Sequence, residues 1–403
     1  MTETFIVVGA GHAAGQAVAT MRSKGFEGRI VMFGDEPYVP YERPPLSKAL
    51  LAGELELERT YLKKESWYPD KDIDFRPNTR VTAFDRKART VTTAKGEALS
   101  YDKMLLATGT RVRKLQVPGA ALDNVFYLRA IDDTLAIRKR MAGGSRVVIV
   151  GGGYIGLEVA AVAVKMGCHV TVLEGLERVM SRVVAPEVSE FYAQVHRDAG
   201  VDIRTGMAVS GFEGGGAVER VHCADGSSYD ADLVVVGVGV IPNVELAAEG
   251  DLAVDNGIVV DEFCQTSDRH IWAAGDCTNH PNSLLGSRLR LESVQNAVDQ
   301  GKTAAAAMCG DRKPYAEIPW FWSDQYDLKL QIVGLSEPGD EVIIRGNPDE
   351  RKFSAVYLRH GKFVAINAVN MIKDFMAAKK MIAEHRAIDE DRVADAGVAL
   401  KDL

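Results

Sequence analysis

The sequence has few cysteines and no long apolar run, and both absences limit where the protein can work. Its five cysteines are odd in number and scattered over 403 residues, without the pairing of a secreted disulfide framework. The longest apolar stretches, such as residues 234–241, are well short of the roughly 20 residues that a membrane helix requires. The amino terminus shows no basic segment followed by an apolar one, so no secretory signal is expected. These absences predict a reducing, cytoplasmic location.

Positive charge is also in short supply. The chain has 48 Lys and Arg residues against 56 Asp and Glu residues, which leaves a net charge of -8. A general nucleic-acid binder needs a surplus of basic side chains to replace phosphate counterions, so the chain as a whole does not fit that class. No metal site is expected. The composition, 46% hydrophobic and 26% charged, is that of a globular protein long enough for two or three domains.

One pattern of strand, glycine turn, helix and strand occurs twice, in residues 5–35 and in residues 146–174. In each copy, four or five apolar residues run directly into glycines, as in a parallel strand that is buried on both faces. An Ala-rich or Val-rich helical stretch and a second apolar strand follow. The sequence therefore predicts two separate βαβ units.

The remaining chain has a different character. Residues 81–93 alternate between apolar and polar side chains like a half-exposed hairpin, and residues 218–229 do the same. From about residue 314 onward, short strands with a turn at residues 359–362 precede a helix that starts at Ile372. Together these patterns predict an α/β protein with two Rossmann-like dinucleotide-binding domains and a separate C-terminal α+β domain.

The first glycine turn reads Gly9-x-Gly11-x-x-Ala14. The first glycine permits a tight turn, the second lets the backbone approach a pyrophosphate, and the small third residue lets the helix pack on the strand. The free N–H groups at the start of the helix then face the phosphates. Asp35 ends the second strand, where a carboxylate can accept hydrogen bonds from a ribose diol.

The second turn, Gly151-x-Gly153-x-x-Gly156, is complete, and Glu174 occupies its ribose position. A carboxylate there binds an unphosphorylated 2′-hydroxyl and repels a 2′-phosphate, which favours NADH over NADPH. Arg178 and Arg182 follow closely and could hold a 2′-phosphate, although exposed charges in a loop are the more common explanation of such residues. An economical reason for two dinucleotides in one chain is hydride transfer between them.

Two further segments resemble known flavoproteins. Residues 266–276 are similar to the second FAD motif of the glutathione-reductase-like flavoproteins, whose final aspartate, here Asp276, binds the ribitol chain. Residues 105–109, which end in Ala107, Thr108 and Gly109, resemble the segment where that family's chain leaves its FAD domain. The first glycine turn is therefore assigned to FAD, and the second turn, with Glu174, to NADH.

Within that superfamily, the sequence resembles the ferredoxin reductases of bacterial oxygenase systems over essentially its whole length. The resemblance is strongest at residues 43–48, 151–158, 291–296 and 319–325. It implies an FAD-binding domain at residues 1–109 and 237–314, an NAD-binding domain at residues 110–236 and a C-terminal domain at residues 315–403. Ala14 in place of a third glycine is a mild departure from the family pattern.

The resemblance and the two glycine motifs together predict the cofactor-binding residues. Those expected at FAD are Gly9, Gly11, Ala13, Ala14, Asp35, Arg43, Lys48, Val81, Ala107, Thr108, Gly109, Arg129, Asp276, Val294 and Trp322. Those expected at NADH are Gly151, Gly153, Tyr154, Ile155, Gly156, Glu158, Glu174, Arg182, Gly239 and Glu292.

The mechanism is limited by missing thiols. Relatives that reduce disulfides need a cysteine pair beside the flavin, and other branches need one cysteine near the position of Pro44 or Ser47; this sequence has neither. Cys277, next to Asp276, is more typical of a small packed residue. Electrons are therefore expected to leave the flavin directly, one at a time, for a 2Fe-2S ferredoxin that serves a haem-thiolate monooxygenase or a Rieske oxygenase.

Three side chains are predicted to be catalytic. The resemblance implies that Lys48 approaches the flavin and pairs with Glu158, which would tune hydride transfer. Trp320 and Trp322 look like core residues from the sequence alone, but the family places an aromatic residue beside the flavin at the position of Trp322. The helix that begins near Glu292 would direct its positive end at the flavin.

The electron acceptor and the functional class of the protein each leave alternatives open. Ferredoxins of this kind are usually acidic, so a docking surface would need local basic residues, which in isolation are also typical of solvated surface charges. The same fold serves reductases of rubredoxin and of monodehydroascorbate or quinones, and redox signalling proteins that resemble apoptosis-inducing factor, although those typically carry basic surfaces or insertions. The candidates for the docking surface are Arg288, Arg290, Lys302, Lys313 and Lys329.

Overall fold

The computed structural model describes residues 3–403 and forms two compact units. Unit 1 comprises residues up to 42, residues 57–111 and residues 241–319; unit 2 comprises residues 43–56, 112–240 and 320–403. The two short strands β8 (Thr110–Val112) and β17 (Val240–Pro242) lie where the chain passes between the units. The three predicted domains divide the chain differently and stay a prediction. Residues 1 and 2 of the predicted FAD-binding domain lie outside the described part of the chain.

Unit 1 is built on a parallel sheet with the strand order β19-β7-β1-β2-β3. The central strand β1 (Thr4–Val8) pairs in parallel with β2 (Arg29–Phe33) on one side and with β7 (Lys103–Leu106) on the other. The outer strands are β3 (Ile73–Arg76) and β19 (Ile271–Ala273). The continuous apolar run in β1 is buried on both faces, which explains why its sequence does not alternate.

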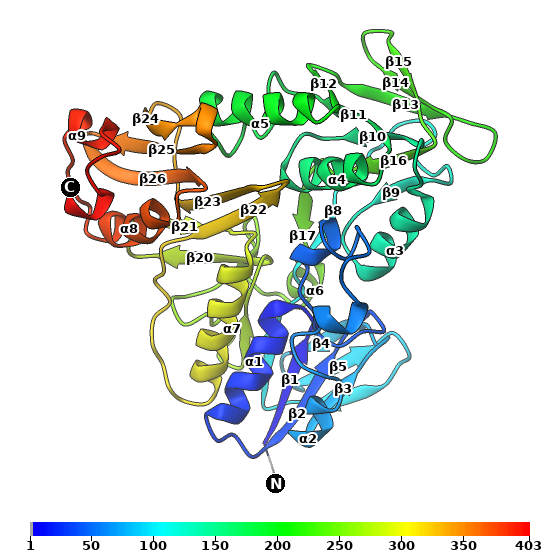
Figure 1. Ribbon diagram of the computed structural model, residues 1–403. Coiled ribbons are helices and arrows are strands. Elements are labelled where there is room, and N and C mark those ends of the chain that lie inside the picture. The colour runs from blue at the N-terminus through cyan, green and yellow to red at the C-terminus, as the bar shows by residue number, and fades with distance from the viewer. Residues whose placement is uncertain (1–2) are drawn as a thin grey trace. The chain divides into compact units, whose positions relative to one another are not determined.

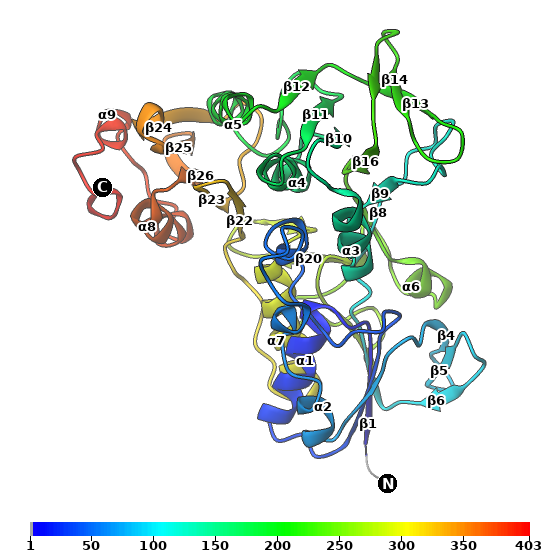
Figure 2. The ribbon, with the colours of Figure 1, turned by 45° about the vertical axis from the view of Figure 1, so that its right-hand side comes forward.

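Each face of this sheet has its own cover. Phe5 and Val7 of β1 pack in a cluster with α1 (His12–Ser23) and α7 (Val294–Met308), two helices that lie side by side (Figure 1). Gly301 makes that closeness possible, because a Cβ there would lie 2.5 Å from the carbonyl oxygen of Ala13. Ile6 and Val8 pack on the opposite face against the three-stranded sheet of β4 (Val81–Asp85), β5 (Thr90–Thr93) and β6 (Ala98–Ser100) (Figure 2). The hairpin predicted over residues 81–93 is therefore present.

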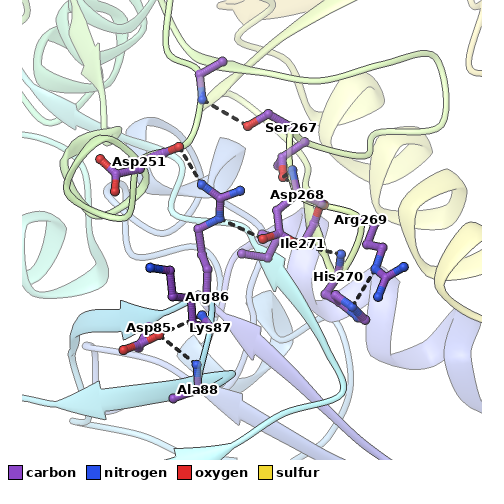
Figure 3. Close-up of polar contacts among 12 residues, drawn as sticks. Asp85, Arg86, Lys87, Ala88, Asp251, Ser267, Asp268, Arg269, His270 and Ile271 are labelled. Atoms are coloured by element: carbon purple, nitrogen blue, oxygen red, sulfur yellow. Dashed lines mark hydrogen bonds and ion pairs between the residues drawn. The ribbon is translucent and has the colours of Figure 1, made fainter.

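Arg86, in the turn between β4 and β5, ties this small sheet to the segment before β19 (Figure 3). Its Nε donates to Asp268 Oδ2 at 2.7 Å and its Nη1 to the carbonyl oxygen of Asp251 at 2.9 Å. Asp268 also accepts from the backbone N–H of His270. Burial raises the pKa of Asp268, but the Arg86 hydrogen bond and the His270 N–H outweigh it, so the net pKa lies below the ordinary value. The remaining elements of unit 1 are η2 (Leu57–Thr60), α2 (Trp67–Asp70), α6 (Glu245–Glu249), β18 (Ile258–Val259), β20 (Thr278–Asn282) and β21 (Ser287–Leu289).

Unit 2 contains a second parallel sheet, with the order β12-β11-β10-β16-β9. Its centre is β10 (Arg146–Val150), which pairs in parallel with β11 (His169–Glu174) and β16 (Leu233–Val236). The second predicted βαβ unit is therefore confirmed, with α4 (Tyr154–Lys165) as its helix. The other elements of this part are η1 (Pro44–Ser47), β9 (Val125–Tyr127), α3 (Ile131–Arg140), α5 (Pro186–Asp198), β12 (Asp202–Thr205), β13 (Val209–Glu213), β14 (Arg220–Cys223) and β15 (Ser228–Asp230).

The C-terminal part of unit 2 is an antiparallel sheet with α8 (Ile372–Ala383) packed on it (Figure 1). Its strands, in the order β22-β23-β26-β25-β24, are β22 (Trp320–Gln325), β23 (Leu328–Gly334), β26 (Lys362–Val369), β25 (Lys352–Arg359) and β24 (Glu341–Asn347). The turn predicted at residues 359–362 joins β25 to β26, and the predicted helix starts at Ile372.

A buried cation fastens the end of the chain to this sheet. Arg345 of β24 is 2% exposed and donates to Asp374 Oδ2 at 3.0 Å. Its remaining nitrogens donate to the backbone carbonyls of Val393, Asp395 and Val398. Each of the three guanidinium nitrogens therefore has an acceptor, as a buried cation requires. The segment that follows α8 contains η4 (Leu400–Asp402) and α9 (Glu390–Ala394), and β24 leads into η3 (Pro348–Glu350).

We predict that Asp268→Asn lowers the free energy of unfolding at pH 7 by about 1–2 kcal/mol, because the charged hydrogen bond with Arg86 is lost. The folded-state pKa of Asp268 is lowered, so this contribution is present above the unfolded pKa of about 4 and is lost as the pH falls through the folded value. Urea unfolding at pH 7 and at pH 3 measures the difference between variant and wild type, which should shrink at pH 3.

Asp202→Asn is the matched control, because Asp202 also bonds an arginine, Arg204, but the two side chains are 45% and 55% exposed. Its effect on the free energy of unfolding should stay within about 0.5 kcal/mol. Equal losses in the two variants would contradict the role given to Asp268.

Candidate functional site

The first glycine turn has the geometry of a phosphate cradle. Gly9 has φ +122° and a Cβ there would lie 2.2 Å from the carbonyl oxygen of Ala107, so only glycine fits. Gly11 precedes α1 with open space where its Cβ would be, and no side chain caps the helix. A pyrophosphate can therefore approach the N–H groups at the start of α1 closely.

Further predicted FAD residues lie at the same edge of the unit 1 sheet. Gly9, Asp35, Ala107 and Asp276 each follow the carboxyl end of one of four neighbouring parallel strands, β1, β2, β7 and β19. This edge is where open α/β sheets bind their ligands. Asp276 accepts a hydrogen bond from Thr110 Oγ1 at 3.4 Å. Also in unit 1 are Ala13 and Ala14 inside α1, Thr108 and Gly109 after β7, Val81 at the start of β4 and Val294 at the start of α7.

The second glycine turn, in unit 2, repeats this geometry. Gly151 has φ +109°, and a Cβ there would lie 2.4 Å from the carbonyl oxygen of Gly237. Gly156 must lack a side chain, because its Cβ would lie 2.1 Å from the carbonyl oxygen of Gly151. Gly153 again precedes an uncapped helix, α4, with open space around it. Both turns thus fit dinucleotides.

Glu174 ends β11 beside the second turn and already binds the glycine loop. Its Oε2 accepts from the N–H of Gly152 at 2.6 Å, and its Oε1 accepts from the N–H of Leu176 at 2.8 Å. Arg178 cannot readily serve a 2′-phosphate, because Nη1 and Nη2 donate to the carbonyls of Val184 and Ser181. The other predicted NADH residues of unit 2 are Tyr154, Ile155 and Glu158 on α4, the exposed Arg182 after β11 and Gly239 after β16.

Lys48 and Glu158 form the predicted ion pair. Lys48 Nζ lies 2.7 Å from Glu158 Oε2, and the carboxylate is 4% exposed. Two hydroxyls complete its surroundings: Ser47 Oγ donates to Oε2 at 2.5 Å, and Ser323 Oγ donates to Oε1 at 2.7 Å. Lys48 Nζ also donates to the carbonyl oxygen of Pro44 at 3.3 Å. Three donors thus hold a buried carboxylate in one orientation.

The aromatic residues of β22 form a row. Trp320 and Trp322 have ring centroids 5.5 Å apart, and Trp320 also contacts Phe375 and the ammonium of Lys379. Phe321 contacts Tyr154 of α4 at 4.8 Å. Trp322 is half-buried.

Among the other predicted FAD residues of unit 2, Arg43 Nη1 donates to the carbonyl oxygen of Arg129 at 2.6 Å.

The candidate docking residues carry less free charge than their sequence suggests. Arg290 pairs with Glu292, Lys302 with Asp299, and Lys313 lies 4.0 Å from Asp311. Arg288 is held by the carbonyls of Val260 and Asn279 and by the Asn279 side chain. Lys329 is exposed on β23 of unit 2. The role of these residues in docking stays a prediction, and pairing with acids weakens the field that they produce.

The five cysteines are all free. Cys277 is fully buried, and burial raises the pKa of its thiol, which is the state of a packed residue and not of a reactive one. Within residues 3–403, no three His, Cys, Asp or Glu side chains gather as a metal site would require. Over the same residues, no helix combines the length and the apolar character needed to cross a membrane.

Comparison with known proteins agrees over the whole chain. Residues 3–301 match the family described as "Pyridine nucleotide-disulphide oxidoreductase", and residues 320–403 match "Reductase C-terminal". Putidaredoxin reductase CamA of Pseudomonas putida is 42% identical, over 100% of this chain and 96% of that protein. The ferredoxin reductase subunit of 5,5'-dehydrodivanillate O-demethylase from Sphingobium sp. is 41% identical, over 99% and 97%.

The chain belongs to the ferredoxin reductases of bacterial oxygenase systems. In the solved covalent complex of putidaredoxin reductase with putidaredoxin, a chain 43% identical to this reductase superposes with a TM-score of 0.96, covering 99% of one chain and 97% of the other. The family uses FAD and NAD(H). The predicted fold of this reductase, two dinucleotide-binding α/β domains followed by a C-terminal domain, is confirmed.

Two serines of the reductase were missed by the sequence analysis. Ser47 and Ser323 bind Glu158 from positions 111 and 165 residues away in the chain. Both lie in stretches that carry the family resemblance, residues 43–48 and 319–325. Their position in these stretches could have marked them as candidates, but the sequence does not show which side chain a serine hydroxyl binds.

For the second cradle, we predict that Glu174→Arg lowers the preference for NADH over NADPH about tenfold or more, because it removes both the ribose acceptor and a charge that repels a 2′-phosphate. Steady-state kcat/KM with each nucleotide measures the ratio. Because Glu174 also binds Gly152, Glu174→Gln is the control: it keeps an acceptor oxygen and should shift the ratio less. An unchanged ratio in Glu174→Arg would place the adenosine ribose elsewhere.

Proposed function

We propose that this reductase oxidises NADH and passes electrons singly to a 2Fe-2S ferredoxin that serves a haem-thiolate monooxygenase or a Rieske oxygenase. The observation that carries the proposal is the presence of two open glycine cradles, one in each unit, without a thiol relay: residues 43–48 contain no cysteine, and all five cysteines are free. Free, scattered cysteines also suit the reducing cytoplasm, where we place the protein.

The residues already described divide between the two cofactors. The sheet edge with Gly9, Asp35 and Asp276 would hold FAD, and the edge with Gly151 and Glu174 would hold NADH. When bound, FAD accepts a hydride from NADH and releases electrons one at a time, which matches a two-electron donor to a one-electron acceptor. The predicted FAD contacts of Arg43, Lys48, Arg129 and Trp322, which belong to unit 2, and the predicted NADH contact of Glu292, which belongs to unit 1, stay part of the proposal.

Lys48 and Glu158 are proposed to act together where the hydride moves. Glu158 and the carbonyl oxygen of Pro44 fix the ammonium of Lys48, so its position does not depend on solvent. Fixed charges in a site shielded from water act more strongly than mobile ones, because no reorganisation is needed when the reaction occurs. This chain's contribution is therefore a held cation, with its counter-ion kept in place by Ser47 and Ser323.

The acceptor is tested directly. We expect NADH-driven reduction of a 2Fe-2S ferredoxin by the FAD-loaded reductase to be much faster than reduction of a rubredoxin or of small quinones, and to weaken with rising salt if docking is electrostatic. Steady-state assays with the three acceptors measure this. Turnover with quinones alone, or fastest turnover with rubredoxin, would overturn the proposal in favour of the related activities of the same fold.

Trp322 is tested by separating the two half-reactions. We predict that Trp322→Ala slows electron transfer to ferredoxin about tenfold while the rate of flavin reduction by NADH changes less than about twofold. Trp320→Ala removes the same side chain from the same strand and is the control for lost packing. Stopped-flow absorbance follows both steps; equal effects on both steps would remove Trp322 from the acceptor route.

A further inference from the structure

A row of buried polar side chains leads away from Glu158 through unit 2. Ser323 and Gln325 alternate with Trp322 along β22, so they share one face of the strand. His196, on α5, contacts Gln325 from the other side, and Tyr326 follows at the end of β22. Ser323 and His196 are 0% exposed and Gln325 is 1% exposed, whereas Tyr326 is 40% exposed. The row therefore connects the protein surface to the buried carboxylate.

Each link in this row is a hydrogen bond. Ser323 Oγ lies 2.7 Å from Glu158 Oε1, and Gln325 Nε2 lies 3.1 Å from Ser323 Oγ. Gln325 Oε1 lies 2.8 Å from His196 Nε2, and the Tyr326 hydroxyl lies 3.0 Å from His196 Nδ1.

The carboxylate determines the direction of the bonds as far as His196 Nε2. A carboxylate only accepts, so Ser323 must donate its single hydrogen to Glu158 and must itself accept from Gln325. The amide nitrogen of Gln325 therefore faces Ser323, and its oxygen accepts from His196 Nε2. His196 Nε2 therefore carries a hydrogen, and in the neutral ring Nδ1 accepts from the Tyr326 hydroxyl. Burial lowers the pKa of His196, and the Gln325 bond offsets this only in part, which agrees with a neutral ring.

Four donors thus point the same way, from the surface toward Glu158. Hydrogen bonds aligned in one direction polarise one another and strengthen the last bond of the row. Apolar side chains of similar volume would fill this space without the free-energy cost of desolvating polar atoms. Packing alone therefore does not explain why the row is polar. The row instead explains why the Ser323 hydroxyl donates to Glu158: Gln325 donates to the same oxygen, so the Ser323 hydrogen is directed at the carboxylate.

We propose that Ser323, Gln325 and His196 are positioning residues, which hold the Glu158 carboxylate, and through it the Lys48 ammonium, in the orientation used for hydride transfer. The proposal rests on the proposed function in one respect, the placing of Lys48 and Glu158 where the hydride moves. None of the three positioning residues needs to touch NADH or FAD. Their effect is transmitted by the orientation of one carboxylate.

The test compares variants of the FAD-loaded reductase by anaerobic stopped-flow reduction with NADH. We expect Ser323→Ala to slow flavin reduction at saturating NADH about tenfold, the size that follows when one hydrogen bond to a charged group is lost. The Kd of NADH and the rate at which ferredoxin reoxidises the flavin should change less than about twofold. In the Glu158→Gln background, Ser323→Ala should add less than about twofold, because the two residues act through one orientation.

Ser354→Ala is the matched control. Ser354, on β25 of the C-terminal sheet, is also 0% exposed, and its hydroxyl also donates to a buried carboxylate, Asp374 of α8, at 3.1 Å. It should lose similar stability, measured as Tm, while reducing its flavin at the wild-type rate. Equal slowing in Ser323→Ala and Ser354→Ala would overturn the positioning role. If Ser323→Ala does not retain FAD, Tyr326→Phe is the second variant. It removes the hydrogen bond at the exposed end of the row and should slow flavin reduction about twofold to threefold. A wild-type rate in Tyr326→Phe would overturn the contribution of the His196–Tyr326 bond.

Different outcomes would contradict the positioning role and the proposed site. If Glu158→Gln is slow and Ser323→Ala is as fast as wild type, the positioning role is wrong and the proposed site stands. If Glu158→Gln reduces its flavin at the wild-type rate, the placing of Glu158 in the hydride-transfer site is wrong.

Discussion

The arrangement of unit 2 depends on one buried carboxylate. Glu158 is an acid at 4% exposure on a helix whose other buried residues are apolar, and a charge there is tolerated only with donors around it. Those donors come from the segment 43–56, which this interaction helps to fix, and from the first strand of the C-terminal sheet. One side chain therefore joins three segments that are far apart in sequence, and removing it would leave an ammonium and two hydroxyls without their shared partner.

Local features were predictable and distant pairings were not. The glycine turns at Gly9 and Gly151 were found because apolar strands run directly into glycines, a pattern that sterics impose within a few residues. The ion pair of Lys48 with Glu158 came from family resemblance alone. The polar row beyond it was missed, because His196 and Gln325 are 129 residues apart and nothing in either segment marks the other as its partner. A buried histidine on an amphipathic helix looks like any core residue until the fold is known.

The charges of the molecule show a related limit of sequence. Counting basic residues suggested a docking surface, but the structure gives Arg290, Lys302 and Lys313 acidic neighbours, and it uses Arg288 to hold backbone carbonyls. Arg345 is an extreme case, since its guanidinium is buried and binds only acceptors inside the C-terminal domain. Residue type alone does not tell a recognition charge from a structural one, because the difference lies in which acceptors the fold brings within reach.

The close contact between α1 and α7 has a consequence for how the first cofactor is received. The two helices share a cluster that includes Ala13, Ala17, Ala297 and Ala304, and Gly301 lies against Ala13; none of these residues has side-chain rotamers to restrict. Ordering such an interface costs almost no side-chain entropy, and a backbone contact as tight as that between Gly301 and Ala13 leaves little freedom for sliding. The amino end of α1, where Gly11 opens the phosphate cradle, is thus rigid before any ligand arrives, so binding energy is not consumed in organising the cradle.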